Sequence, residues 1–171
     1  MKQLKSYTIG GIIFVLILGS VSHFFYEWSG YNLIVGLFSP INESTWEHMK
    51  LIFFPMLLYS FVAVPILRDN YPCIGSAYLA EIIIGTLLVP VIFYTYTGIL
   101  GFHTLVLDIV TFVLSVVIAF VVAYRLTLTC KAKSYSAVLC GVVILMLISF
   151  MVFSCYPPKI GLFLDPTHEK H

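Results

Sequence analysis

The chain has 171 residues, of which 60% are hydrophobic, 16% aromatic and only 10% charged. Soluble domains carry about 25% charged residues, so this composition excludes an ordinary water-soluble domain. The net charge of +1 also excludes a generally basic nucleic-acid-binding protein and an acidic disordered chain. A mean hydropathy of +1.02 predicts an integral membrane protein that is surrounded by membrane lipids.

Five apolar segments are long enough to cross a bilayer, which takes roughly 20 residues in a helix. They cover approximately residues 8–26, 49–67, 74–98, 104–124 and 135–155. Their apolar runs are long and unbroken, whereas the strands of a membrane barrel would alternate over segments of about 10 residues. The sequence therefore predicts an all-α fold, a polytopic transmembrane helical bundle that forms one domain over residues 1–171.

The placement of Lys and Arg predicts the orientation of this bundle. One side carries six of them and the other side carries three, namely Lys2, Lys5, Arg68, Arg125, Lys131 and Lys133 against Lys50, Lys159 and Lys170. Because cytoplasmic loops are enriched in Lys and Arg, we expect the N-terminus inside and the C-terminus outside the cell membrane.

The first segment also has features of a signal peptide, with a basic start and small residues at Ser20–Ser22. The aromatic residues from Phe24 to Trp28 are typical of the interfacial belt that ends a true span. We therefore expect the segment to be retained as the first span. Cleavage would leave four spans with the same outer surface.

The four cysteines do not form a recognisable framework. Cys73, Cys130 and Cys140 are expected near the cytoplasmic side and Cys155 near the outer side, and the sequence has no Cys-x-x-Cys pair. We interpret all four as small apolar side chains without a disulfide.

All five histidines fall in the outer half of the predicted topology, together with most of the acidic residues. Histidine combined with carboxylate is the ligand chemistry of zinc, iron and manganese. The sequence therefore suggests a site for a divalent metal ion, with zinc as the leading candidate, on the extracytoplasmic side.

The densest polar segment is residues 40–50, PINESTWEHMK. Ser44 followed three residues later by Glu47 forms a capping box, which would begin the second span. Capping of the helix gives His48 no role. His48 lies four residues after Ser44, on the same helical face. We weigh capping alone against capping combined with a site, in which Glu47 and His48 are metal ligands and Glu43 is a general base.

His103 and Asp108 form a second polar pair at the start of the fourth span. Asp108 is expected roughly 7 Å deeper than His103, from five residues at about 1.5 Å each. A carboxylate at that depth normally faces the interior of the bundle. We predict His103 as a metal ligand and Asp108 as the residue that orients a ligand or a water.

Glu81 is the other acid expected inside the membrane, near the middle of the third span. It is either a protonated structural residue or part of a proton path. Pro90 follows it on the same helix and would open space there.

The C-terminal tail returns towards the outer surface after Pro157 and Pro158 end the fifth span. Its apolar residues would lie on the membrane surface, and His168 would then approach the mouth of the bundle as a further metal ligand. The competing interpretation is a frayed terminus.

Two blocks of sequence resemble a family of small bacterial integral membrane proteins of unknown function. They are residues 42–55, NESTWEHMKLIFFP, and residues 161–166, GLFLDP. The resemblance implies a multi-span domain over the whole chain and supplies no activity.

Ser44 and His48 are followed by an Asp in a later helix and by the paired His168 and His171. This pattern also resembles that of the membrane hydrolases related to alkaline ceramidases and adiponectin receptors. Those proteins have seven spans, hold zinc through histidines and space the terminal pair by three residues, where this chain has two. The likeness concerns the chemistry of the residues and not the fold.

Two functions remain open at this point. The first is a metal-dependent hydrolase whose outward-facing site acts on a lipid-like or amphipathic small molecule. The alternative is a proton-linked carrier, or a membrane accessory protein without catalysis, in which Glu81 and Asp108 line one path.

Overall fold

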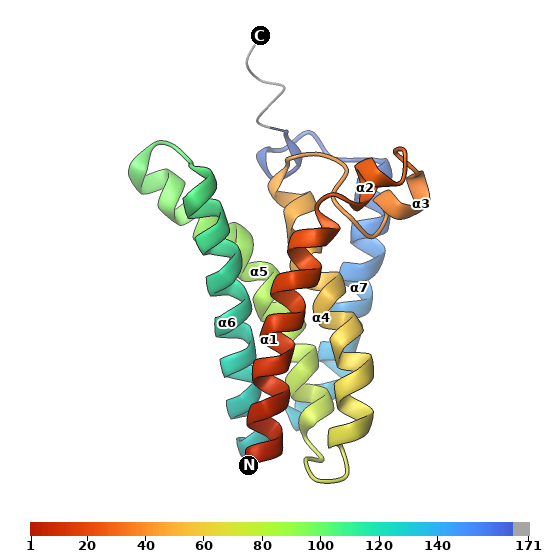
Figure 1. Ribbon diagram of the computed structural model, residues 1–171, viewed down its shortest axis with the longest axis vertical. Coiled ribbons are helices and arrows are strands. Elements are labelled where there is room, and N and C mark those ends of the chain that lie inside the picture. The colour runs from red at the N-terminus through yellow and green to blue at the C-terminus, as the bar shows by residue number, and fades with distance from the viewer. Residues whose placement is uncertain (166–171) are drawn as a thin grey trace.

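Five long helices, joined by short loops and turns, make up most of the protein (Figure 1). The computed structural model describes residues 1–165. The long helices are α1 (Lys2–Ser22), α4 (Thr45–Leu67), α5 (Ile74–Leu100), α6 (Leu105–Thr129) and α7 (Ser136–Cys155). The short elements are α2 (Phe25–Trp28), α3 (Leu33–Gly36), η1 (Lys133–Tyr135) and η2 (Gly161–Phe163). All regular structure within residues 1–165 is helical, which confirms the predicted fold class.

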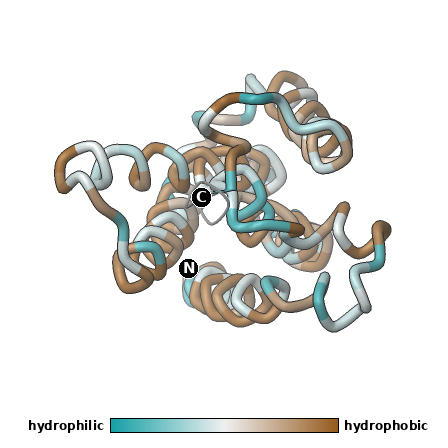
Figure 2. The backbone as a smooth tube through the Cα atoms, turned by 90° about the horizontal axis from the view of Figure 1, so that it is seen from above, coloured by the Kyte–Doolittle hydropathy of each residue, from teal (hydrophilic) through white to brown (hydrophobic). Residues whose placement is uncertain are grey.

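Each long helix is suited to cross a membrane. All five are long enough, and their most apolar windows have mean hydropathies between 1.8 and 2.9. Even the 20 residues of α7 reach about 30 Å at about 1.5 Å per residue, the thickness of the hydrocarbon layer. Seen along the bundle, the helices are mostly hydrophobic and the hydrophilic residues gather in the connecting segments (Figure 2).

The helices α4 and α5 contribute most to the core of the bundle. The helix α5 packs against α4, α6 and α7, while α1 packs against α4 and α6. The side chains of Phe53, Met56, Ile82, Phe120 and Phe150, which come from four helices, are almost completely buried. The outward faces carry exposed apolar side chains, as expected for surfaces in contact with lipid.

Side-chain hydroxyls cap the starts of α4 and α6, and the cap at Ser44 was predicted from the sequence. The Ser44 hydroxyl accepts the Glu47 N–H at 3.3 Å, and the Thr104 hydroxyl accepts the Leu107 N–H at 3.3 Å. The reciprocal half of the expected capping box is replaced, because the Ser44 N–H donates to the Asn42 side chain at 2.9 Å. The Glu47 carboxylate is thereby free for other contacts.

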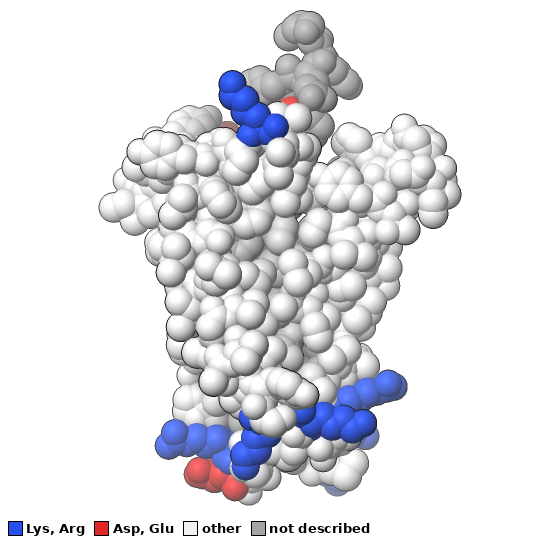
Figure 3. Space-filling view, turned by 180° about the vertical axis from the view of Figure 1, so that it is seen from behind, with Lys and Arg blue, Asp and Glu red and all other residues white. Residues whose placement is uncertain are grey.

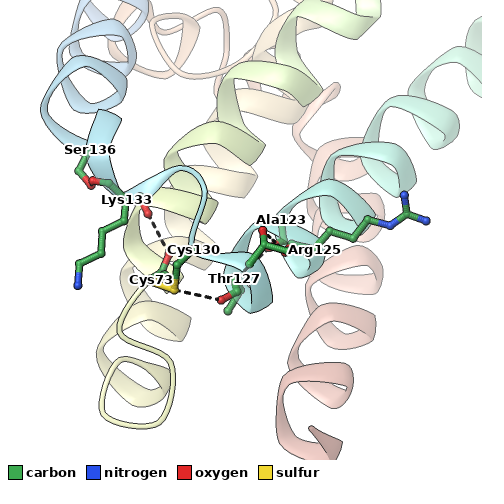
Figure 4. Close-up of a disulfide and its surroundings, with 9 residues drawn as sticks. Cys73, Ala123, Arg125, Thr127, Cys130, Lys133 and Ser136 are labelled. Carbon is green, nitrogen blue, oxygen red and sulfur yellow. Dashed lines mark hydrogen bonds between the residues drawn. A yellow bond between two sulfur atoms is a disulfide. The ribbon is translucent and has the colours of Figure 1, made fainter.

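The prediction that none of the cysteines forms a disulfide is wrong. Cys73, just before α5, and Cys130, just after α6, form a disulfide that joins the ends of these two helices (Figure 4). The two residues are 57 positions apart in sequence, and only the antiparallel packing of α5 on α6 brings them together. Cys140 and Cys155 are free and exposed.

Exposed basic side chains gather at the end of the bundle that holds the N-terminus (Figures 1 and 3). They are Lys2, Lys5, Arg68, Arg125, Lys131 and Lys133. At the opposite end, Lys159 is exposed and Lys50 is fully buried. Among residues 1–165, the exposed basic side chains are therefore concentrated at the end that holds the N-terminus.

Candidate metal centre

Three side chains converge where α1 ends and α4 begins. His23 follows the last residue of α1, Glu43 lies in the loop before α4, and His48 is in the first turn of α4. The Glu43 carboxylate lies between the two rings, with Oε1 3.6 Å from His23 Nε2 and Oε2 3.4 Å from His48 Nε2. One ligand atom from each residue lies within 4.8 Å of the other two.

These spacings fit a tetrahedral metal ion. Ligand atoms that are each about 2.1 Å from such an ion lie about 3.4 Å from one another. Two histidines and one carboxylate are also the donor set of catalytic zinc sites in which the fourth position is open to water or substrate.

The backbone orients His48 for this role. Its Nδ1 lies 2.9 Å from the Ser44 carbonyl oxygen, which can only accept, so Nδ1 carries the hydrogen. Nε2 faces Glu43 and donates a hydrogen bond to it when the ring carries both protons; loss of the Nε2 proton would free the lone pair as a ligand. Ligating histidines commonly make this kind of bond through their second nitrogen.

The charge states of the other two residues suit a cation as well. The hydrogen bond from His48 is the main reason that the pKa of Glu43 is lowered, and this keeps the carboxylate ionised. Burial lowers the pKa of His23 and favours its neutral form, the form that binds metals.

The Glu43 backbone N–H donates to Asp165 Oδ2 at 3.3 Å, which holds the loop to the C-terminal tail.

The three residues lie on the wall of a cavity of about 540 Å³. One wall is formed by the ends of α1 and α4, and the opposite wall by α5 and α6, whose outer ends diverge from α1 (Figure 1). Gly161 and Leu164 of the tail also line the cavity. Its volume is in the range of small-molecule sites.

A second polar group faces this cavity from α6. Asp108 Oδ2 lies 3.4 Å from His103 Nδ1, and the Tyr96 hydroxyl donates to Asp108 Oδ1. His103 and Asp108 both line the cavity, so the structure brings His48 and His103 to one pocket, as the sequence analysis required. This arrangement orients the His103 ring, in the manner of a carboxylate that holds a general base.

A smaller cavity of about 350 Å³ lies on the other side of the same group. It shares His23 and Glu43 with the large cavity, and its remaining lining residues come from residues 24–31 and 40–42. The candidate metal centre therefore stands where a largely apolar cavity meets a more polar one.

The structure places the predicted site residues in different surroundings. Glu43 and His48 belong to the three-residue group, while His103 and Asp108 lie across the cavity. Glu47 is buried, and its carboxylate binds Lys50 Nζ at 2.6 Å, so it is not part of the group. His168 lies outside the described residues.

His23 is the member of the group that the sequence analysis did not assign. In the sequence it counts only as one of the five histidines of the outer half. The one available signal was that it shares this end with His48. Glu43 stands before the helix start, so helical spacing could not show that it faces His23.

Glu81 lies away from the metal centre. It is fully buried in α5, and neither carboxyl oxygen has a hydrogen-bond partner among the described residues. Its polar neighbours include the hydroxyls of Tyr59 and Tyr78, which interact with it electrostatically.

A family model matches the whole chain, residues 1–171, and describes a family of unknown function, DUF6512. The chain belongs to this family. No curated protein and no solved structure matches it. The family has no activity to carry over, so the function has to be inferred from the site.

Proposed function

We propose that this protein is a membrane-embedded metal-dependent hydrolase. His23, Glu43 and His48 would hold a divalent ion, zinc by the nature of the ligands, and the substrate would be lipid-like. The observation that carries the proposal is the convergence of two imidazole nitrogens and one carboxylate on the wall of a 540 Å³ cavity.

The surrounding residues supply what hydrolysis requires. A divalent ion with an open position polarises a carbonyl group and lowers the pKa of a bound water. His103, oriented by Asp108 at 3.4 Å, would accept the proton of the attacking water and pass it to the leaving group. The apolar walls would exclude competing water from the reacting bond.

Metal analysis of the purified protein tests this proposal. We expect about one zinc ion per chain, because three protein ligands with an open position form a standard catalytic site. His48→Ala should lower zinc affinity by at least about 100-fold, since loss of a ligand exceeds the loss of a group that only orients one.

His103→Ala is the matched control, because it changes a histidine in the same cavity outside the three-residue group. It should keep the metal and lose hydrolysis of ester substrates. A protein that binds no divalent ion, with His23, Glu43 and His48 acting only as an ion-paired cluster, would refute the proposal.

One observation favours a second function, a proton-linked carrier. Glu81 is buried in the bundle without a hydrogen-bond partner among residues 1–165, and an acid in such a position is commonly functional in membrane proteins. A carrier would lose pH-driven uptake into vesicles on Glu81→Gln and keep it on His48→Ala. A hydrolase would show the opposite dependence in its activity.

A further inference from the structure

The large cavity changes from polar to apolar with depth. Leu51 lies one helical turn below His48 on α4, and Phe112 lies one turn below Asp108 on α6. Both line the cavity, as do Val89 and Phe93 of α5. The polar groups therefore surround the mouth, and aliphatic and aromatic side chains form the interior between the helices.

The helix α1 packs closely against α4 and α6 beside the cavity. At Gly19, a Cβ atom would lie 2.5 Å from the Leu51 carbonyl oxygen and 2.7 Å from the Phe112 ring. Leu51 and Phe112 also line the cavity. A ligand group between them has to be largely apolar, because burial of apolar surface is the main favourable contribution available there.

The small cavity has a different character. Its lining includes the rings of Tyr26 and Tyr31, the amide of Asn42 and the carboxylates of Glu27 and Glu43, with no Lys or Arg among the described residues that form it. Such a lining offers hydrogen bonds to hydroxyl groups and, apart from the ion that Glu43 would help to neutralise, only the negative charge of Glu27 to a phosphate.

From these two cavities we infer the substrate class of the proposed hydrolase: an amphiphile with a hydrocarbon chain and an uncharged, hydroxylated head group. Its hydrocarbon chain lies in the large cavity among Leu51, Val89 and Phe112. Its head group lies in the small cavity, and the bond to be cleaved lies at His23 and Glu43, where the two cavities meet. The inference rests on the proposed function for the position of that bond and on cavity chemistry for the rest.

A series of straight-chain hydroxamates, from acetohydroxamate to octanohydroxamate, tests where the chain lies. Binding is measured by calorimetry on the whole protein in amphipol, with empty amphipol subtracted. We expect affinity, referred to ligand in water, to rise about fourfold per added methylene until the cavity is full. Octanohydroxamate that binds no more tightly than acetohydroxamate would overturn the chain placement.

Two variants locate the binding to the cavity. Val89→Trp fills its interior and should abolish the dependence on chain length, while Val91→Trp is the control, because that side chain is 58% exposed on the outside of the same helix. If Val89→Trp does not fold, Val89→Phe takes its place, since it fills the same part of the cavity with a smaller increase in volume. A chain-length dependence unchanged in the folded variant would overturn the placement.

The head group is tested with a 1-O-alkylglycerol and its phosphate ester of the same chain length. In both compounds an ether bond joins the chain to the glycerol, so the enzyme cannot hydrolyse that bond. The glycerol ether should bind at least tenfold more tightly than its phosphate. Glu27→Lys should remove or reverse this preference, and Asp69→Lys, at an exposed position outside both cavities, should not. Equal or tighter binding of the phosphate to the unchanged protein would overturn the head-group assignment.

The 1-alkanols of matching length separate this inference from the proposed function. Alkanols that bind as tightly as hydroxamates, with or without added zinc, would refute the metal centre and leave the chain placement standing. Hydroxamates that bind only with zinc, and without dependence on chain length, would support the metal centre and refute the substrate class.

Discussion

Lys50 is a charged side chain that the fold buries completely, two residues after His48 on α4. Its ammonium group contacts Glu47 at 2.6 Å and the carbonyl oxygens of Gly36 and Ser39 at 2.8 and 3.4 Å. The Glu47 carboxylate in turn accepts the Ile41 N–H at 3.0 Å. This ion pair fastens the loop that leads to Glu43, so it supports the site without belonging to it.

Replacement of Lys50 by Met should destabilise the protein by about 3–5 kcal/mol, because it leaves the Glu47 carboxylate buried without a counter-ion. Unfolding in mixed micelles of a denaturing detergent measures the difference. Lys159→Met, at an exposed position, is the control and should change stability by less than about 0.5 kcal/mol. Equal effects of the two variants would show that the pair does not hold the fold together.

The sequence indicated which residues lie at the outer end of the bundle, but not which side chains each of them contacts. It predicted that Glu43, His48, His103 and Asp108 would lie near one another, because membrane burial gathers polar groups of one leaflet into the same mouth. It assigned Glu47 to the metal, since a capping residue and a ligand look alike in sequence. Only the folded loop shows that Glu47 turns towards Lys50.

Among the elements, α1 has to approach α4 and α6 closely for His23 to reach Glu43. Gly19 permits this approach, and His23 follows it by four residues, at the end of the same helix. The long helices were predictable in number and approximate position, because a bilayer demands continuous apolar runs. Their ends were less so, since α1 begins at Lys2 and α6 ends at Thr129, against the predicted 8 and 124. The loop geometry and the Cys73–Cys130 disulfide depend on packing between distant segments, so the sequence alone did not reveal them.

Gly19→Ala should therefore displace α1, with a stability cost of about 1–3 kcal/mol for overpacking. It should also weaken zinc binding about tenfold or more, because His23 moves with the helix. Zinc titration with a chelator as competitor measures the second effect. Gly10→Ala is the control on the same helix, since a Cβ there would lie 3.7 Å from the Tyr59 hydroxyl, an ordinary contact. Zinc affinity unaltered by Gly19→Ala would contradict the account of α1.

At the scale of the whole molecule, the exposed basic residues and the disulfide lie at the same end of the bundle. The basic residues favour the cytoplasm for this end, where disulfides are rare. Because the difference in exposed basic residues is large, we expect this end to face the cytoplasm. Cys73 and Cys130 are placed to form the disulfide, and we expect the reducing cytoplasm to keep them as thiols in growing cells until the protein is exposed to an oxidant.

Acid trapping of cells, followed by denaturation and labelling with a maleimide, tests this expectation in a variant with Cys140→Ala and Cys155→Ala. We expect both remaining cysteines to be labelled without prior reduction. Labelling that requires a reductant would show that this end faces an oxidising compartment, and the metal centre would then face the cytoplasm.

X-ray absorption spectroscopy at the zinc edge tests the central claim most directly, because it reports which atoms surround the ion. The account predicts two imidazole nitrogens and one carboxylate oxygen at about 2.0–2.2 Å, with one further oxygen ligand from solvent. It also predicts the loss of one imidazole in His23→Ala and no loss in His103→Ala. Sulfur ligands, or the same spectrum in all three proteins, would contradict it.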